Sequence, residues 1–324
     1  MIAVGLNPYG IAYANGIAGR GTARANPKPL SVNEYVALAE RIGATGIEFH
    51  YEMLTGLGES ELSKLRERLT GKGWFVVVSS PLPDADASMA GARGVGARLC
   101  RMHLSSILCG DRAAAECDWL GTLKGVKGRL REAAARAADL GLRLAIENHQ
   151  DFTSQELLEL CDHAGRNVGV CFDCGNALSV GEDPVAFATA IKGRAFHIHL
   201  KDYRAQFTDE GYRLVRCPIG NGAVDFREIF RVLDGPDAPA GTIECGALNA
   251  RHIRLFTAQW WRHYPPKSAE QLAAAVRAAR VNRLAEDAEW RTPWELGASF
   301  DEIVRYEMGE LERSVGNLKR LGLM

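Results

Sequence analysis

The sequence predicts a (β/α)8 barrel over residues 1–250, followed by a helical extension over residues 251–324. Three observations support this prediction. Eight short apolar segments alternate with longer amphipathic ones, several of the apolar segments are almost continuously apolar through their middles, and polar residues stand where many of them end. Parallel strands that are buried on both faces have such apolar middles. At 324 residues and 47% apolar composition, the chain is large enough to bury a sizeable core.

The expected strands, in chain order, cover residues 2–7, 45–50, 74–79, 97–103, 142–147, 168–173, 195–200 and 241–245. Helical patterns separate them. In residues 31–42, Ser31 and Glu34 have the spacing of a capping box, and residues 112–140 are rich in Ala, Arg, Leu and Glu. A doubly wound open sheet is the competing architecture. It would spread the polar strand ends along an edge, whereas a barrel gathers them around one mouth, and no GxGxxG motif follows the first strand.

Two regions fall outside the plain barrel pattern. Residues 8–30 contain four glycines and three prolines and form a long first loop on the mouth side, and loops of this kind often act as lids. The extension contains helical patterns near residues 267–289 and 299–321. We expect it to pack on the barrel or on a neighbouring subunit.

The composition disfavours several classes of partner. Lys and Arg total 39 against 40 for Asp and Glu, which gives a net charge of −1 and favours neither nucleic acid nor an anionic membrane surface. No apolar run is long enough to span a bilayer, and the first residues lack the pattern of a signal peptide. Cys171 and Cys174 form one CxxC, for which packed strand cysteines are a better interpretation than a zinc or redox site. We expect a cytoplasmic protein that acts on a small molecule, as a homo-oligomer or with a second kind of subunit.

The chemistry is expected at the ends of the fifth to eighth strands, where four potential metal ligands stand: Glu147, Asp173, His199 and Glu244. Three carboxylates and one imidazole form a hard, oxygen-rich set. Clustered carboxylates without a cation would repel one another strongly. The sequence therefore predicts one divalent metal ion, with Mn²⁺ favoured over Mg²⁺, Co²⁺ and Zn²⁺.

The motifs IENH (146–149), FDCGNA (172–177), HIHLKDY (197–203) and CPIGNGAVDF (217–226) resemble the sugar isomerase/epimerase superfamily, the xylose-isomerase-like TIM barrels. Ketose 3-epimerases, hydroxypyruvate isomerases, inosose dehydratases and endonuclease IV belong to it. The resemblance implies the same four residues as metal ligands. The stretch IENHQDFTS (146–154) and the C-terminal helices also resemble 3-oxo-sugar decarboxylases and the large subunits of C-glycoside deglycosidases.

In the epimerases that the sequence resembles, the two ligating glutamates, here Glu147 and Glu244, act as the acid/base pair. His149 is a second candidate, because it shares strand parity with Glu147 and would point inward. A metal ion that polarises a carbonyl and a neighbouring hydroxyl would stabilise an enediolate. We therefore expect an isomerase or epimerase of a keto sugar or an oxidised sugar derivative. The alternative is a lyase on a 3-oxo sugar, whether decarboxylase, dehydratase or C-glycoside-cleaving.

Two further functions are less favoured. The 3-epimerases and endonuclease IV both have a histidine where this sequence has Asn176. An abasic-site endonuclease would resemble endonuclease IV, which also builds a trinuclear zinc cluster from many histidines. This chain has 8 histidines in all, two of them in the extension. A non-catalytic sugar-binding barrel would not need four metal ligands.

Other residues near the predicted mouth are candidates for substrate binding: Lys201, His50, His103, Asn7, Tyr9 and Asn176. Lys201 would bind a carboxylate or phosphate, or else pair with a barrel glutamate such as Glu48. His197 would lie one layer below His199, as a buried partner of a ligand or with a direct role. Arg20, Arg24 and Arg112 would clamp an anionic substrate or only solvate loops.

Overall fold

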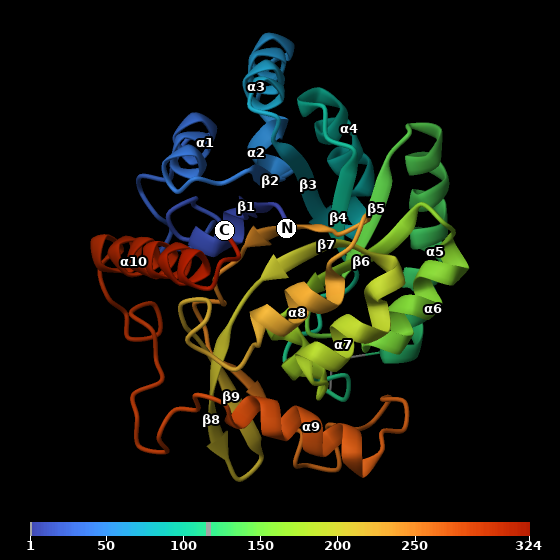
Figure 1. Cartoon of the computed structure of the whole chain (residues 1–324), viewed down its shortest axis with the longest axis vertical. Helices are drawn as coiled ribbons and strands as arrows, with labels where there is room; N and C mark the ends of the chain where they lie inside the picture. Colours follow the sequence, from blue (N-terminus) through green and yellow to red (C-terminus); the bar gives the residue numbers. More distant parts are fainter. Residues whose placement is uncertain (1, 115–117) are drawn as a thin grey trace.

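The computed structural model of the protein describes residues 2–114 and 118–324. Its centre is a closed barrel of eight parallel strands in the order β1-β10-β7-β6-β5-β4-β3-β2 (Figure 1). β1 pairs with both β2 and β10, and this pairing closes the barrel. The predicted (β/α)8 barrel is thereby confirmed. Its strands are β1 (Val4–Leu6), β2 (Gly46–His50), β3 (Phe75–Pro81), β4 (Leu99–His103), β5 (Arg143–Glu147), β6 (Val168–Asp173), β7 (Ala195–Leu200) and β10 (Ala240–Ile243).

All eight predicted strands are present. The bounds of β6 and β7 match the prediction, and those of the other strands differ from it by at most two residues. Every residue of β6 is buried, as the continuous apolar run predicts for a strand covered on both faces. Cys171 on β6 and Cys174 just beyond it are buried free thiols, in agreement with their interpretation as packing residues.

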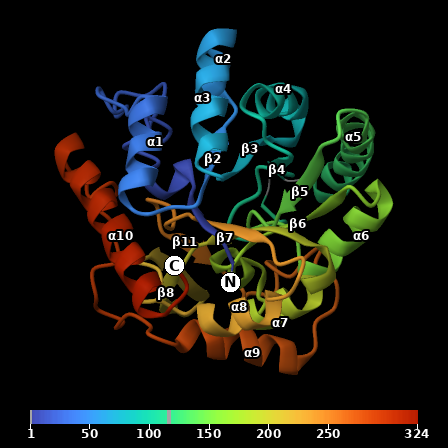
Figure 2. The ribbon, with the colours of Figure 1, turned by 45° about the horizontal axis from the view of Figure 1, so that its top comes forward.

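Helices surround the barrel, as Figure 2 shows for α1, α3, α4, α5 and α6. α1 begins with the predicted capping box of Ser31 and Glu34. Among the described residues, no helix combines the length and apolar character needed to cross a membrane. The α-helices are α1 (Val32–Arg41), α2 (Glu52–Thr55), α3 (Glu59–Gly71), α4 (Ala85–Val95), α5 (Trp119–Asp139), α6 (Ser154–Ala164), α7 (Pro184–Ile191), α8 (Phe226–Leu233), α9 (Ala269–Arg280) and α10 (Phe300–Arg320).

Three short 3-10 helices follow strands, namely η1 (Pro8–Ile11) after β1, η2 (Leu82–Asp84) after β3 and η3 (Gly175–Val180) after β6, and a fourth, η4 (Lys192–Arg194), connects α7 to β7. The predicted helical stretch 112–140 is shorter in the structure, since α5 begins at Trp119 and residues 115–117 lie outside the described part of the chain. The two stretches predicted in the extension contain α9 and α10.

A second sheet, which the sequence analysis missed, adjoins the barrel. It has three antiparallel strands in the order β11-β9-β8, namely β8 (Tyr203–Thr208), β9 (Gly211–Arg216) and β11 (Arg251–Ile253). The β8–β9 hairpin is inserted between β7 and α8, and α9 packs along β8 (Figure 1). At Gly211, where φ is +154°, a Cβ atom would lie 2.0 Å from the carbonyl oxygen of Ile253. This glycine therefore permits the close approach of β11.

The last helix, α10, packs on the barrel and on the loop that follows β1. Leu311, Val315 and Leu318 belong to the same apolar cluster as the barrel strands. The buried carboxylate of Glu307 accepts hydrogen bonds from the backbone N–H groups of Tyr13, at 3.0 Å, and Ala14, at 2.9 Å. Hydrogen bonds to Glu307, near the middle of α10, therefore hold the long loop of residues 8–30 against the C-terminal helix.

We predict that Glu307→Ala destabilises the protein by about 3 kcal/mol, because two buried N–H groups lose their acceptor. Urea unfolding followed by circular dichroism measures this change. Glu312→Ala, an exposed position on the same helix, is the control and should change the free energy of unfolding by less than about 0.5 kcal/mol. Equal effects of the two substitutions would contradict the proposed fastening.

Candidate metal centre

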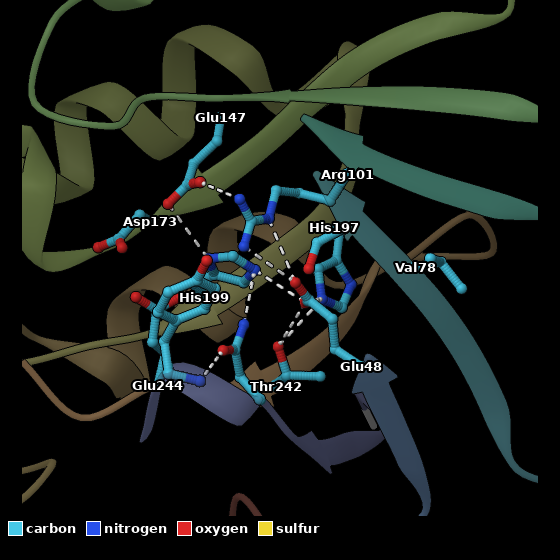
Figure 3. A network of polar contacts seen from close by, with 12 residues as sticks. Glu48, Val78, Arg101, Glu147, Asp173, His197, His199, Thr242 and Glu244 are labelled. Atoms are coloured by element: carbon cyan, nitrogen blue, oxygen red, sulfur yellow. Dashed lines mark hydrogen bonds and ion pairs between the residues drawn. The ribbon is translucent and has the colours of Figure 1, made fainter. Parts of the chain in front are cut away.

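The four predicted metal ligands converge at the C-terminal rim of the barrel. Glu147 ends β5, Asp173 ends β6, His199 lies on β7, and Glu244 follows β10. One ligand atom from each of the four lies within 4.8 Å of the others, and all four residues are buried. Figure 3 shows Glu147, Asp173 and Glu244 around the His199 ring. The register contributes, because Asp173 pairs directly with His199 across the two neighbouring strands.

The orientation of the His199 ring suits a metal ligand. Its Nδ1 lies 2.7 Å from Glu244 Oε2 and 3.3 Å from Glu147 Oε1, while its Nε2 lies 3.0 Å from Glu48 Oε2. Burial would lower the pKa of His199, but the surrounding carboxylates, Glu48 among them, hold it well above its usual value, so the ring is a cation without a metal ion. A bound metal ion would take the place of the Nδ1 proton, and Nε2–H would still donate to Glu48. Histidine ligands are commonly oriented by a carboxylate in this way.

The donor set fits a divalent cation. Glu244 Oε2 is buried and has no hydrogen-bond partner among the described residues, although Nδ1 of His199 is only 2.7 Å away. The two atoms form an ion pair while the His199 ring is protonated, and a cation in place of that proton would contact both. Oxygen-rich sets with one imidazole suit Mn²⁺ or Mg²⁺. That these four residues bind a metal stays a prediction.

Arg101, which the sequence analysis did not single out, supports the centre from the next layer of the barrel. Its guanidinium lies between Glu48 Oε1, at 3.2 Å, and Glu147 Oε2, at 3.1 Å (Figure 3). Burial by itself would raise the pKa of Glu147, but the charges of Arg101 and His199 outweigh it and hold that pKa well below its usual range. An arginine within an expected strand, with the same parity as His103, was the available signal.

Lys201 neutralises the other side of the centre. Its Nζ lies 2.5 Å from Asp173 Oδ2 and 2.6 Å from Glu244 Oε1. Burial would raise the pKa of Glu244, but Lys201 and His199 lower it to about 2. For Asp173 burial dominates and raises the pKa to about 7 despite Lys201. The predicted alternative, a salt bridge from Lys201 to a barrel glutamate, is present, but the glutamate is Glu244 and not Glu48.

Glu48 has other partners. It pairs with Arg101 and His199, and its Oε2 lies 3.4 Å from Nε2 of His197. His197 also contacts the hydroxyl of Thr242 at 3.1 Å. His197 is thus placed beneath the metal centre, where it contacts the partner of a ligand.

A cavity of about 310 Å³ opens beside the centre, and we call it the mouth cavity. Pockets that bind small molecules have volumes of about 300–1,000 Å³, and this cavity lies at the lower end of that range. Residues 17–19 of the long first loop form part of its wall. The polar and aromatic residues that line it include Tyr9, His149, Gln150, Lys201, Arg216, Glu244, Asn249, Arg251 and Trp294.

His149, the second acid/base candidate, lines this cavity. Its Nδ1 is buried without a hydrogen-bond partner among the described residues, and burial lowers its pKa. The ring stacks on that of His103, with 4.9 Å between the ring centroids. A neutral imidazole in this place has the lone pair that a general base needs.

The remaining substrate-binding candidates occupy different places. Tyr9 lines the mouth cavity and makes an edge contact with the His50 ring, at 5.9 Å. Asn7 lies beneath the centre, with Nδ2 3.2 Å from Nε2 of His199. Asn176 is buried, and neither its amide oxygen nor its nitrogen has a partner among the described residues. His103 lines an adjacent cavity.

The three arginines considered for an anion clamp are engaged elsewhere. Arg112 is fully buried, pairs with Glu156 and stacks between the rings of Trp119 and Tyr264. Arg20 pairs with Glu52 on the surface, and Arg24 stacks on Trp294. These contacts with protein groups do not favour an anion clamp made of the three residues.

We predict that Glu48→Gln weakens Mn²⁺ binding about 10- to 100-fold, the range found when the partner of a ligand is removed. The neutral amide orients His199 less strongly and leaves Arg101 with one carboxylate. Titration calorimetry with Mn²⁺ measures the affinity. Glu52→Gln, an acidic residue just beyond the same strand, is the control and should bind Mn²⁺ like the unmodified protein. Unchanged affinity in Glu48→Gln would refute this role.

We predict that Lys201→Met destabilises the metal-free protein by about 3–5 kcal/mol, because Asp173 and Glu244 lose their buried cation. Saturating Mn²⁺ should recover most of this loss, since it neutralises the same carboxylates. Chemical unfolding with and without Mn²⁺ gives both values. Lys72→Met removes a half-exposed lysine beside Glu40 and serves as the control. A loss that is the same with and without Mn²⁺ would argue against shared neutralisation.

Comparison with known proteins places this geometry in a family. The model of the xylose isomerase-like TIM barrel family matches residues 36–246, more than half of the chain. An inosose dehydratase of Clostridium perfringens is 30% identical over 134 residues, which cover 37% of this chain and 44% of that protein. The match therefore spans less than half the length of that relative.

Two solved structures share the fold at low sequence identity. A D-psicose 3-epimerase of Clostridium cellulolyticum H10, solved with D-tagatose, has a TM-score of 0.59 at 13% identity and covers 98% of this chain and 99% of its own. A xylose isomerase-like TIM barrel protein of Mycobacterium smegmatis, solved with magnesium, has a TM-score of 0.58 at 18% identity, with 86% and 98% covered. The chain belongs to the xylose isomerase-like TIM barrel family, an enzyme family that includes epimerases and dehydratases.

Proposed function

We propose that the protein is a divalent-metal-dependent isomerase or epimerase that acts on a keto sugar or an oxidised sugar derivative. The observation that carries the proposal is the convergence of Glu147, Asp173, His199 and Glu244 within 4.8 Å, beside a cavity that can hold a sugar. The magnesium in the Mycobacterium smegmatis structure and the sugar in the epimerase structure belong to those proteins. They support the proposal by analogy.

The four residues would hold one metal ion, Mn²⁺ by preference, which when bound polarises a carbonyl and a neighbouring hydroxyl oxygen of the substrate. Glu147 and Glu244 have lowered pKa values and are ionised at neutral pH. Either carboxylate can therefore accept the proton from the carbon next to the carbonyl. They reach the substrate from different strands, so that one removes the proton and the other returns it. This division of roles is what an epimerase requires.

The polar side chains around this pair keep it in place. Arg101 fixes Glu147 from the next layer of the barrel, and Lys201 fixes Glu244 from the side of the mouth cavity. Tyr9 in the wall of the cavity is suited to the substrate's hydroxyl groups. The amide of Asn176, buried beside Asp173, has unused donors and acceptors.

A lyase on a 3-oxo sugar is the second candidate, favoured by the inosose dehydratase relatives and by His149. A lyase must also protonate or release a group beside the enediolate carbon, and an acid/base next to the carboxylate pair would serve this step. His149 lines the cavity and has an unengaged, buried Nδ1. A decarboxylase or a C-glycoside-cleaving enzyme would use the same enediolate.

The test is proton exchange in D₂O with Mn²⁺-loaded protein and a panel of keto sugars, followed by NMR. We expect deuterium at the carbon next to the carbonyl, and Glu147→Gln should reduce this exchange by about 10²–10⁴-fold, the contribution of a positioned acid/base. Release of CO₂, water or an aglycone without a new epimer would favour the lyase instead.

The conservative Asp86→Asn, an exposed surface change, is the matched control and should retain full exchange. Circular dichroism must show that Glu147→Gln is folded. Full exchange in chelated protein would refute the metal-dependent mechanism, and full exchange in folded Glu147→Gln would refute the acid/base role of Glu147.

A further inference from the structure

Three cationic side chains line the mouth cavity, and two of them already have carboxylate partners. Lys201 pairs with Asp173 and Glu244. Arg216 has Nε 2.8 Å from Glu310 and Nη1 3.7 Å from Glu307. Arg251, the third, forms no ion pair and no side-chain hydrogen bond with any residue in 2–114 or 118–324.

Arg251 is the first residue of β11, and the hairpin pairing fixes its position. β11 pairs with β9 in the register Arg251↔Leu214, with Tyr212 opposite Ile253. Ile253, which shares the strand parity of Arg251, is fully buried in an apolar cluster with Tyr203 and Trp260. Arg251 therefore points to the inner face of the small sheet, and its Nε is buried without an acceptor.

A buried donor on an unpaired cation is costly unless a ligand satisfies it. The carboxylate of Glu244, which lines the cavity, forms ion pairs with Lys201 and His199. The charges of the metal-centre carboxylates are thus neutralised by neighbouring side chains. The positive charge of the Arg251 guanidinium, elsewhere in the cavity wall, has no carboxylate partner among the described residues. A planar guanidinium presents paired donors that match a carboxylate.

We propose that Arg251 binds a carboxylate of the substrate, at the end remote from the carbons that face the metal centre. The substrate is then an acidic keto sugar. This inference rests on the proposed function, and it assigns to Arg251 the anion-binding role that the sequence analysis considered for Lys201. The cavity of about 310 Å³ is large enough for a six-carbon sugar acid.

The test compares three ketoses that share carbons 1 to 5 and differ at carbon 6: D-fructose, D-fructuronate and D-fructose 6-phosphate. Binding to Mn²⁺-loaded protein is measured by calorimetry. D-fructuronate should bind about 10- to 100-fold more tightly than D-fructose, as expected for a hydrogen-bonded charged pair. Arg251→Gln should abolish this preference, so that the two affinities become similar, and Arg251→Lys should retain part of it.

The matched control is Arg254→Gln. Arg254 lies just beyond the same strand, is half exposed and pairs with Asp111, and its loss should leave the preference unchanged. Binding of D-fructuronate less than tenfold tighter than that of D-fructose, including no binding of either, would overturn the proposal, as would a preference that survives in Arg251→Gln. Tighter binding of the phosphate ester would overturn the carboxylate assignment.

The two proposals fail in different ways. Absence of Mn²⁺ binding to the unmodified protein would remove the metal-dependent function itself. Normal Mn²⁺ binding, together with equal affinity for D-fructose and D-fructuronate, would leave that function in place and refute only the role of Arg251.

Discussion

Three carboxylates buried at the rim of the barrel are the constraint on which the rest of the site depends. Glu147, Asp173 and Glu244 converge on His199, and like charges at such distances are tolerated only with compensation. Arg101 supplies it from within the barrel, and Lys201 supplies it beside the mouth. The two cations contact one oxygen of each carboxylate, and the other oxygens of Glu147 and Glu244 face Nδ1 of His199. The charges in the protein thus preserve a negative pocket that a divalent ion can neutralise.

The interior of the barrel is layered, and the layers explain this arrangement. Its floor is an apolar group formed by Val77, Leu99, Ala145 and Cys171. Because residues two apart on a strand share a direction, the next inward positions above Leu99 and Cys171 are Arg101 and Asp173. The apolar floor lowers the local dielectric constant and strengthens the electrostatic interactions above it. A single inward arginine can therefore hold two carboxylates, Glu48 and Glu147, in fixed positions.

The sequence predicted those features that follow from the alternation of side chains along a strand and from the positions of the strand ends. Strand parity and strand ends predicted the barrel and brought the four ligand candidates to one rim. They did not predict the partners of Lys201. Glu48 pairs with Arg101 and His199, and Lys201 pairs with Asp173 and Glu244 instead. The β8–β9 hairpin was missed because its strands, unlike those of the barrel, have no continuous apolar run. Arg251 could not be placed without that hairpin, since β9 is the strand with which it pairs.

Chemistry and specificity therefore arise from different parts of this chain. The candidate ligands and acid/base residues stand at the ends of barrel strands, which are the parts that a shared fold preserves. Much of the mouth cavity wall comes from elsewhere: the loop of residues 8–30, β11, and Trp294 in the segment before α10. Glu307 on α10 fastens that loop. Solved relatives at 13–18% identity share the barrel, but a shared barrel carries no information about an arginine on an inserted sheet. The substrate has to be inferred from the wall of the cavity, and in that wall Arg251 is the cation without a partner among the described residues.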